Sequence, residues 1–128
     1  MNIQPINNSS LNFSGKIITR GKWPITMINA FEFNPEVQKL ASGEFNIIGK
    51  VSRKKPSKDD IYHYENERLY KLSIIAMPEK ATLMDNVKYL FGMLPKINLT
   101  QKYHSDATMV NLMKERIQFN SYKEKLGI

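Results

Sequence analysis

The two histidines of this sequence are the residues best suited to catalysis, and each stands beside tyrosine. His63 and His104 together offer a general base and a general acid, and small basic proteins cleave RNA with such a pair. Lys71 or Lys102 would then stabilise the negative charge that develops on the phosphate. This hypothesis makes the chain a small toxin-type ribonuclease or another hydrolase. A structural role for each histidine is the competing interpretation, because their order along the chain does not require them to meet.

Other motifs with a defined chemistry do not occur in the sequence. Asp60, His63 and Glu65 carry metal-binding atoms, but their spacing matches no recognised metal site. There is no phosphate-binding loop, dinucleotide fingerprint, nucleophile elbow or zinc-protease motif. The absence of cysteine excludes disulfides and zinc–thiolate sites. We therefore predict no metal and no cofactor, and we expect a binding role rather than catalysis.

Basic residues outnumber acidic ones by 19 to 12, which gives the chain a net charge of +7. A basic protein favours acidic partners such as nucleic acid, an anionic membrane surface or an acidic protein. The excess is spread evenly, at +2, +2 and +3 over residues 1–43, 44–80 and 81–128. A concentrated positive patch must therefore be made by folding.

Length and hydropathy predict one domain without a membrane span. A chain of 128 residues is the size of a single domain. Residues 1–11 are rich in Asn and Ser and are predicted to be a flexible N-terminal arm, followed by one domain over residues 12–128. No secretory signal and no apolar segment near the roughly 18 residues of a transmembrane helix occur. We expect a cytoplasmic protein of bacterial or phage character, and export without an N-terminal signal stays open.

Hydrophobic patterning predicts an α+β fold. Strands are predicted over residues 12–21, 44–55, 67–78 and 96–104. Helices are predicted from Pro24 to Asn34, from Asn34 to Gly43, from Thr82 to Gly92 and from Ser105 to about Leu126. Asn34 and Ser105 are predicted N-caps, and Thr82 with Asp85 fits a capping box. This order matches a four-stranded, mainly antiparallel sheet of the split βαβ, ferredoxin-like type with an added C-terminal helix.

One face of the predicted sheet is apolar and the other is basic. The side chains predicted to point into the core are Phe45, Ile47, Gly49, Val51, Tyr70, Leu72, Ile74, Ala76, Ile97, Leu99 and Tyr103. The second face carries His104 and five cationic candidates for binding nucleic-acid phosphates, namely Lys16, Arg20, Lys50, Lys71 and Lys102. Its centre carries Ile18, Ile48 and Ile75 in place of the rings on which RNA-binding sheets stack bases. A nucleic-acid-binding protein is thus one alternative, and an apolar element that covers the isoleucines is the other.

The predicted C-terminal helix is the obvious cover, because its apolar arc is wider than a single surface stripe. Such an arc can pack on the sheet and also meet a partner. Its predicted contact residues are Leu112, Arg116, Phe119, Tyr122 and Leu126, and the loop at residues 56–66 is a second contact surface. Our leading hypothesis is a small basic binding or assembly module without catalytic activity, which associates with itself or with another protein.

Overall fold

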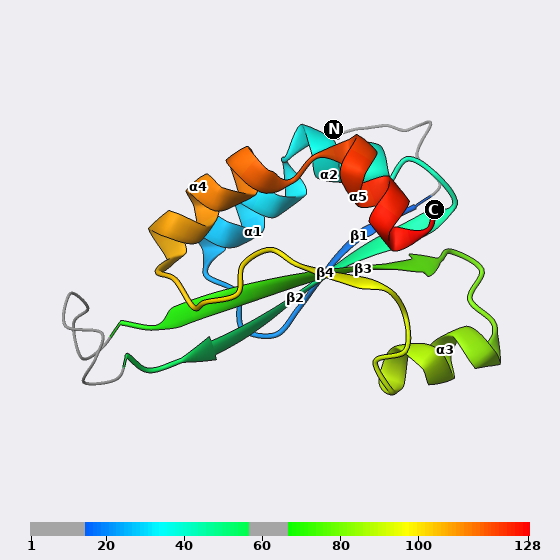
Figure 1. The fold of residues 1–128 in the computed structure, drawn as a ribbon, viewed down its shortest axis with the longest axis horizontal. Helices are drawn as coiled ribbons and strands as arrows, with labels where there is room; N and C mark the ends of the chain where they lie inside the picture. Colours follow the sequence, from blue (N-terminus) through cyan, green and yellow to red (C-terminus); the bar gives the residue numbers. More distant parts are fainter. Residues whose placement is uncertain (1–14, 57–66) are drawn as a thin grey trace, which may run out of the picture.

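The structure, a computed structural model, describes residues 15–56 and 67–128. These residues form a mixed four-stranded sheet in the order β1 (Ile17–Arg20), β2 (Phe45–Lys54), β3 (Leu69–Pro78) and β4 (Lys96–Asn98). One face of the sheet, termed the helical face, carries α1 (Ile25–Glu32), α2 (Pro35–Leu40), α4 (Asp106–Arg116) and α5 (Phe119–Leu126). Helix α3 (Leu83–Leu90) lies on the opposite face, termed the second face (Figure 1). The predicted N-terminal arm and most of the predicted contact loop lie outside the described residues.

The strand order corrects the predicted ferredoxin-like topology. β1 and β2 are parallel and pair directly, with Ile17 opposite Ile47 and Arg20 opposite Lys50. In a split βαβ sheet another strand separates the two parallel strands. Here β3 instead lies outside β2, and the pairs β2–β3 and β3–β4 are antiparallel. The α+β class and the mainly antiparallel pairing are confirmed. Within the described ranges, no helix is both long and apolar enough to cross a membrane.

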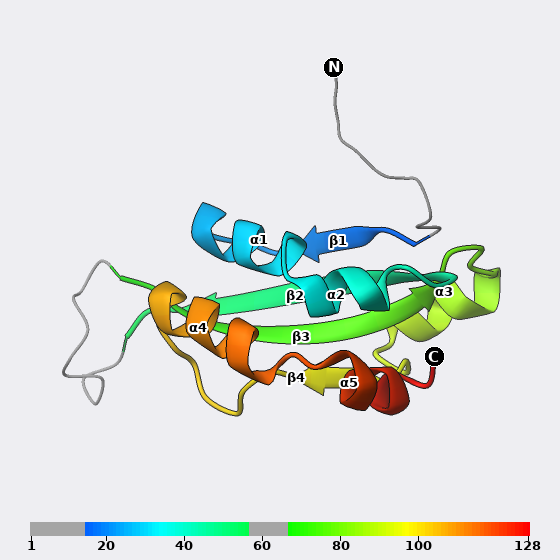
Figure 2. The same ribbon diagram turned by 90° about the horizontal axis from the view of Figure 1, so that it is seen from above.

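The main core lies between the sheet and the helical face. Figure 2 shows α1 beside α4 and α2 beside α5 over the strands. The predicted inward residues that are buried in this core are Ile47, Val51, Leu72, Ile74, Ala76, Ile97 and Leu99. Gly49 faces the core without a side chain, and a Cβ there would lie 2.8 Å from the Phe31 ring and 2.9 Å from the Trp23 ring. Glycine therefore allows these aromatic rings to approach the sheet closely.

The predicted single C-terminal helix is in fact two helices, because the backbone is extended at Ile117. Asn34 Nδ2 donates a hydrogen bond of 3.2 Å to the carbonyl oxygen of Met113, near the end of α4. The Glu36 carboxylate accepts a hydrogen bond of 3.1 Å from the N–H of Phe119, the first residue of α5. Ile117 itself is buried in the main core. The break allows α4 to pack on α1 and α5 to pack on α2.

Glu36 makes the stability of the fold depend on pH in a predictable direction. The N–H of Phe119, and after it the ammonium of Lys39, lower the pKa of Glu36 below its usual range. The carboxylate therefore stabilises the fold above the ordinary glutamate pKa of about 4.3, and this contribution is lost as the pH falls through the folded-state pKa. We expect Glu36→Gln to reduce the fall in the urea midpoint between about pH 5 and about pH 3. Glu124→Gln, at an exposed position of α5, is the control, and an equal effect of both substitutions would contradict this role.

Candidate binding surfaces

Helix α3 covers one end of the second face. A small second core forms there from Ile48, Ile75 and Met77, with Ile18, Ala81, Tyr89 and Leu94 packed against it. The prediction that an apolar element covers the isoleucines is confirmed, since Ile48 and Ile75 are buried and Ile18 is half-buried. The covering element is α3 and not the C-terminal helix, because α4 and α5 pack on the helical face.

The outer side of α3 is apolar and exposed. No residue of α3 is buried, and Leu83, Leu90 and Phe91 are 82%, 77% and 76% exposed. At about 100° per residue, five side chains fall on this outer side and are termed the apolar stripe: Leu83, Met84, Val87, Leu90 and Phe91. A spacing of i, i+4 and i+7 is the pattern that a helix normally turns toward its core. In α3 four residues of the stripe are exposed and Val87 is half-buried, so most of the stripe faces solvent.

The residues that cap and terminate α3 do not belong to the apolar stripe. Thr82 Oγ1 accepts a hydrogen bond of 3.2 Å from the N–H of Asp85. The Asp85 carboxylate accepts one of 2.9 Å from the N–H of Thr82, which confirms the predicted capping box and lowers the pKa of Asp85. Gly92 has a φ of 67° and terminates the helix. The apolar stripe is therefore not needed to begin or end α3.

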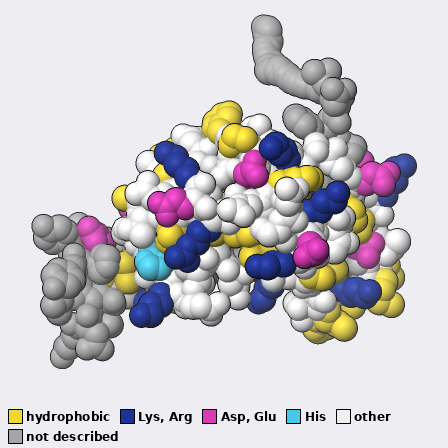
Figure 3. All heavy atoms as spheres, turned by 45° about the horizontal axis from the view of Figure 1, so that its top comes forward, with side chains coloured by type: hydrophobic (Ala, Val, Ile, Leu, Met, Phe, Trp, Pro, Cys, Tyr) yellow, Lys and Arg dark blue, Asp and Glu magenta, His cyan; other side chains and the backbone are white. Residues whose placement is uncertain are grey.

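Lysines flank the apolar stripe. Lys80 precedes α3, Lys88 lies on it and Lys96 begins β4, and all three are exposed. In the described part of the chain, the ion pair is that of Lys39 with Glu36, so none of the flanking lysines is paired with a carboxylate. Figure 3 shows apolar side chains gathered at the end of the molecule where α3 lies. This end therefore combines an apolar centre with exposed lysines, next to the acidic residues Glu79 and Asp85.

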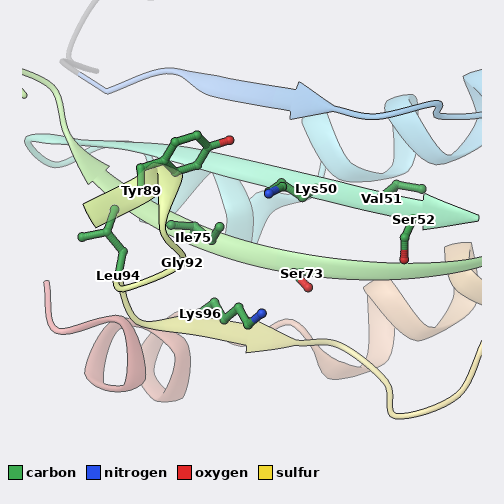
Figure 4. A pocket seen from close by; sticks show the side chains of 9 residues that line it. All are labelled: Lys50, Val51, Ser52, Ser73, Ile75, Tyr89, Gly92, Leu94 and Lys96. Carbon is green, nitrogen blue, oxygen red and sulfur yellow. The ribbon is translucent and has the colours of Figure 1, made fainter. Parts of the chain in front are cut away.

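The rest of the second face is polar. Four residues lie side by side across the strands, namely Arg20, Lys50, Ser73 and Asn98. The next row contains Ser52 and Lys71, and these six residues are termed the basic rows. Between the basic rows and α3 lies a hollow of about 180 Å³, lined by Lys50, Val51, Ser52, Ser73, Ile75, Tyr89, Gly92, Leu94 and Lys96 (Figure 4).

Two tyrosine rings lie at opposite ends of the basic rows. The ammonium of Lys50 is 5.5 Å from the centroid of the Tyr89 ring. The ammonium groups of Lys54 and Lys71 are 4.9 Å and 4.8 Å from the centroid of the Tyr103 ring. These are cation–π distances. The second face therefore combines aromatic rings with its positive charge.

Tyr103 lies on the second face and not in the main core, which corrects the prediction. β4 ends at Asn98, and the Thr100 hydroxyl donates a hydrogen bond of 2.7 Å to the carbonyl oxygen of Lys102. The resulting bend interrupts the alternation of side chains that a regular strand would continue. Tyr103 consequently contacts Lys71 on the second face. No glycine or proline between residues 99 and 104 signals this bend.

The chain matches no protein-family model, no curated protein and no solved structure. Function is therefore inferred from the geometry of the described residues. Two surfaces have a distinctive chemistry on that basis: the apolar stripe with its flanking lysines, and the basic rows between Tyr89 and Tyr103.

The catalytic candidates are not brought together in the described residues. His104 pairs with Tyr70 through two backbone hydrogen bonds, of 2.7 Å and 3.0 Å. Because cross-strand partners share a face of a sheet, His104 lies on the side of Tyr70, whereas Lys71 faces the second face. The prediction of His104 on the second face is therefore wrong, and His63 lies outside the described residues. Within residues 15–56 and 67–128, no three His, Asp or Glu residues are grouped as metal ligands.

The five cationic candidates for phosphate binding occupy different positions. Lys50, Lys71 and Arg20 belong to the basic rows. Lys16 is exposed one residue before β1, and Lys102 is exposed in the bend after β4. Folding therefore gathers three of the five into one surface.

The predicted contact surface on the C-terminal helix belongs mostly to the main core. Tyr122 and Leu126 are buried there, and Leu112 and Phe119 are half-buried against it. Arg116 is exposed. The apolar arc is wide because it belongs to two helices, α4 and α5, and each of them buries its own apolar side in the main core. The exposed stripe on α3 was missed, although its i, i+4, i+7 spacing is visible in the sequence.

Proposed function

We propose that this protein is a non-catalytic binding module that inserts α3 into an apolar groove of a protein partner. The supporting observation is the direction of the apolar stripe, which points away from the sheet while the other side of α3 covers the second core. Burying a large aliphatic or aromatic side chain contributes about 1.5–3 kcal/mol. A helix with anchors at i, i+4 and i+7 is a recurrent means of binding a hydrophobic groove.

The flanking lysines specify the chemistry of that groove. Lys80 and Lys88 are exposed, one just before α3 and one on it, so a groove with an acidic rim complements them. A second copy of this chain fits less well, because it would place like charges together and each copy carries +7. An eight-residue helix is also only about 12 Å long, which is short for the roughly 800 Å² that each side of a standard interface buries.

The test replaces two residues of the stripe by glutamine. Leu83→Gln combined with Leu90→Gln removes two anchors and keeps good helix formers. Ile25→Gln combined with Phe33→Gln is the matched control, because these side chains are 70% and 71% exposed at the two ends of α1. Proteins captured by the wild type are identified, purified and titrated by calorimetry. We expect a partner that binds the wild type and the control equally but binds the stripe variant at least about 30-fold more weakly, as for the loss of about 2 kcal/mol at a hot spot.

Three outcomes would contradict this proposal. If the stripe variant and the control variant retain every captured protein equally, the stripe does not bind a partner. A dimer in sedimentation velocity that only the stripe variant abolishes would assign the stripe to a second copy. Binding to anionic lipid vesicles that only the stripe variant loses would assign it to a membrane surface.

A further inference from the structure

Among the described residues, the cations of the basic rows form no ion pair with a carboxylate. Arg20 and Lys50 are opposite each other on β1 and β2, and Lys71 lies one row further along β3. The short polar side chains of Ser52 and Ser73 separate them. A surface of this kind attracts phosphate groups, because each contact releases a counterion from the nucleic acid.

Tyr89 and Tyr103 lie beside different lysines of the second face. Tyr89 lies beside Lys50, and Tyr103 lies beside both Lys54 and Lys71. The Cα atoms of Lys50 and Lys54, four residues apart on β2, are separated by roughly 13 Å at about 3.3 Å per residue. The hydroxyl groups of Ser52 and Tyr103 are 3.3 Å apart and share a hydrogen bond, which holds this ring beside the sheet. Two rings on one basic face provide stacking platforms for bases, with the nucleic-acid backbone above the lysines.

We infer that this surface binds single-stranded nucleic acid. Lys50 and Lys71 contact phosphates, and the two tyrosine rings stack on bases. The Asn98 amide, whose oxygen accepts from Ser73 Oγ at 2.7 Å, adds donors for base or sugar oxygens. A duplex fits less well, because its bases are stacked on one another and do not reach the rings. The site is separate from the apolar stripe, because Tyr89 lies on the inner side of α3.

The first test compares two double variants, each of which loses two lysine charges: one from the second face and one from the helical side of the molecule. Lys50→Gln with Lys71→Gln is compared with Lys114→Gln with Lys125→Gln, which lie exposed on α4 and α5. Fluorescence anisotropy of a labelled oligothymidylate of about 12 nucleotides is measured at about 50 mM and about 200 mM salt. We expect the first pair to weaken binding at least about tenfold and to reduce the salt slope by about 1.4, since each phosphate contact contributes about 0.7. The second pair should change affinity by less than about twofold.

The second test removes a ring without changing the charge. Tyr103→Leu should weaken binding by about tenfold at an unchanged salt slope, because stacking does not involve counterions. Phe119→Leu is the matched control, since its half-buried ring also lies beside an ammonium, that of Lys123 at 5.5 Å, but on the helical face. Thermal melting verifies that each variant is folded. The variant with Leu83→Gln and Leu90→Gln should bind the oligonucleotide like the wild type.

Several results would overturn this inference. No binding by the wild type at the lower salt concentration would do so, as would equal losses from the two lysine pairs. An unchanged dissociation constant for Tyr103→Leu would exclude stacking. Equal affinity for inorganic polyphosphate would indicate a general polyanion surface, and tighter binding of a duplex of the same length would exclude single-strand recognition.

Discussion

Replacing Phe31 by alanine should lower the free energy of unfolding by about 3–5 kcal/mol. Phe31 is fully buried, and its ring centroid lies 5.3 Å from that of Trp23. The ring also packs over Gly49, which has no side chain to fill the space that the substitution leaves. Because domains of this size have a total stability of roughly 5–15 kcal/mol, the urea midpoint should fall by a large fraction of its value.

Phe33→Ala is the matched control, two residues further along the chain. Phe33 is 71% exposed, so its loss should change the free energy of unfolding by less than about 0.5 kcal/mol. Gly49→Ala should cost about 1–3 kcal/mol by overpacking, and less when Phe31 is already alanine, because one of the two obstructing rings is gone. Equal costs of Phe31→Ala and Phe33→Ala in urea unfolding would contradict the packing of α1 on the sheet.

Asn34→Ala should lower the free energy of unfolding by about 2–4 kcal/mol, the sum of two separate losses. The Asn34 carboxamide oxygen caps α2 by accepting from the N–H groups of Glu36 and Val37 at 2.8 Å and 3.3 Å. Its nitrogen donates to the carbonyl oxygen of Met113. That carbonyl also accepts a longer bond, of 3.4 Å, from the N–H of Ile117. The effect is large because Asn34 is buried between α2 and α4.

Two further variants separate these contributions in the same urea measurements. Asn34→Ser keeps an acceptor for the cap but is too short to reach Met113, so it should cost about half as much as Asn34→Ala. Thr82→Ala removes the cap of α3 at an exposed position and should cost about 1 kcal/mol. Wild-type stability of Asn34→Ser would show that the bond to Met113 contributes nothing.

Features that depend on a few adjacent residues were predictable from the sequence. Asn34 caps α2 and Thr82 caps α3 as predicted, because a cap is decided within one helical turn. The alternation in β2 and β3 likewise identified most of their buried residues, because neighbouring side chains of a strand point to opposite faces.

Features that depend on distant residues were not predictable. β1 was recognised as a strand, but its pattern does not say which edge of a sheet it joins, so its parallel pairing with β2 was missed. The break at Ile117 contains no glycine or proline. Two hydrogen bonds hold this break, from Asn34 to Met113 and from Phe119 to Glu36. The partners are 79 and 83 positions apart in the sequence, so no local pattern predicts these bonds.

For the two candidate surfaces as well, the sequence determined some features and the tertiary structure determined the others. The sequence by itself determined that α3 is amphipathic and that the chain is basic. A helical pattern fixes which side chains share a side of the helix, but packing decides how the helix is rotated about its axis. In α3, the contacts of Tyr89 with the second core turn the apolar stripe toward solvent. The evenly spread cations likewise became one surface only when the pairing of β1 with β2 placed Arg20 beside Lys50.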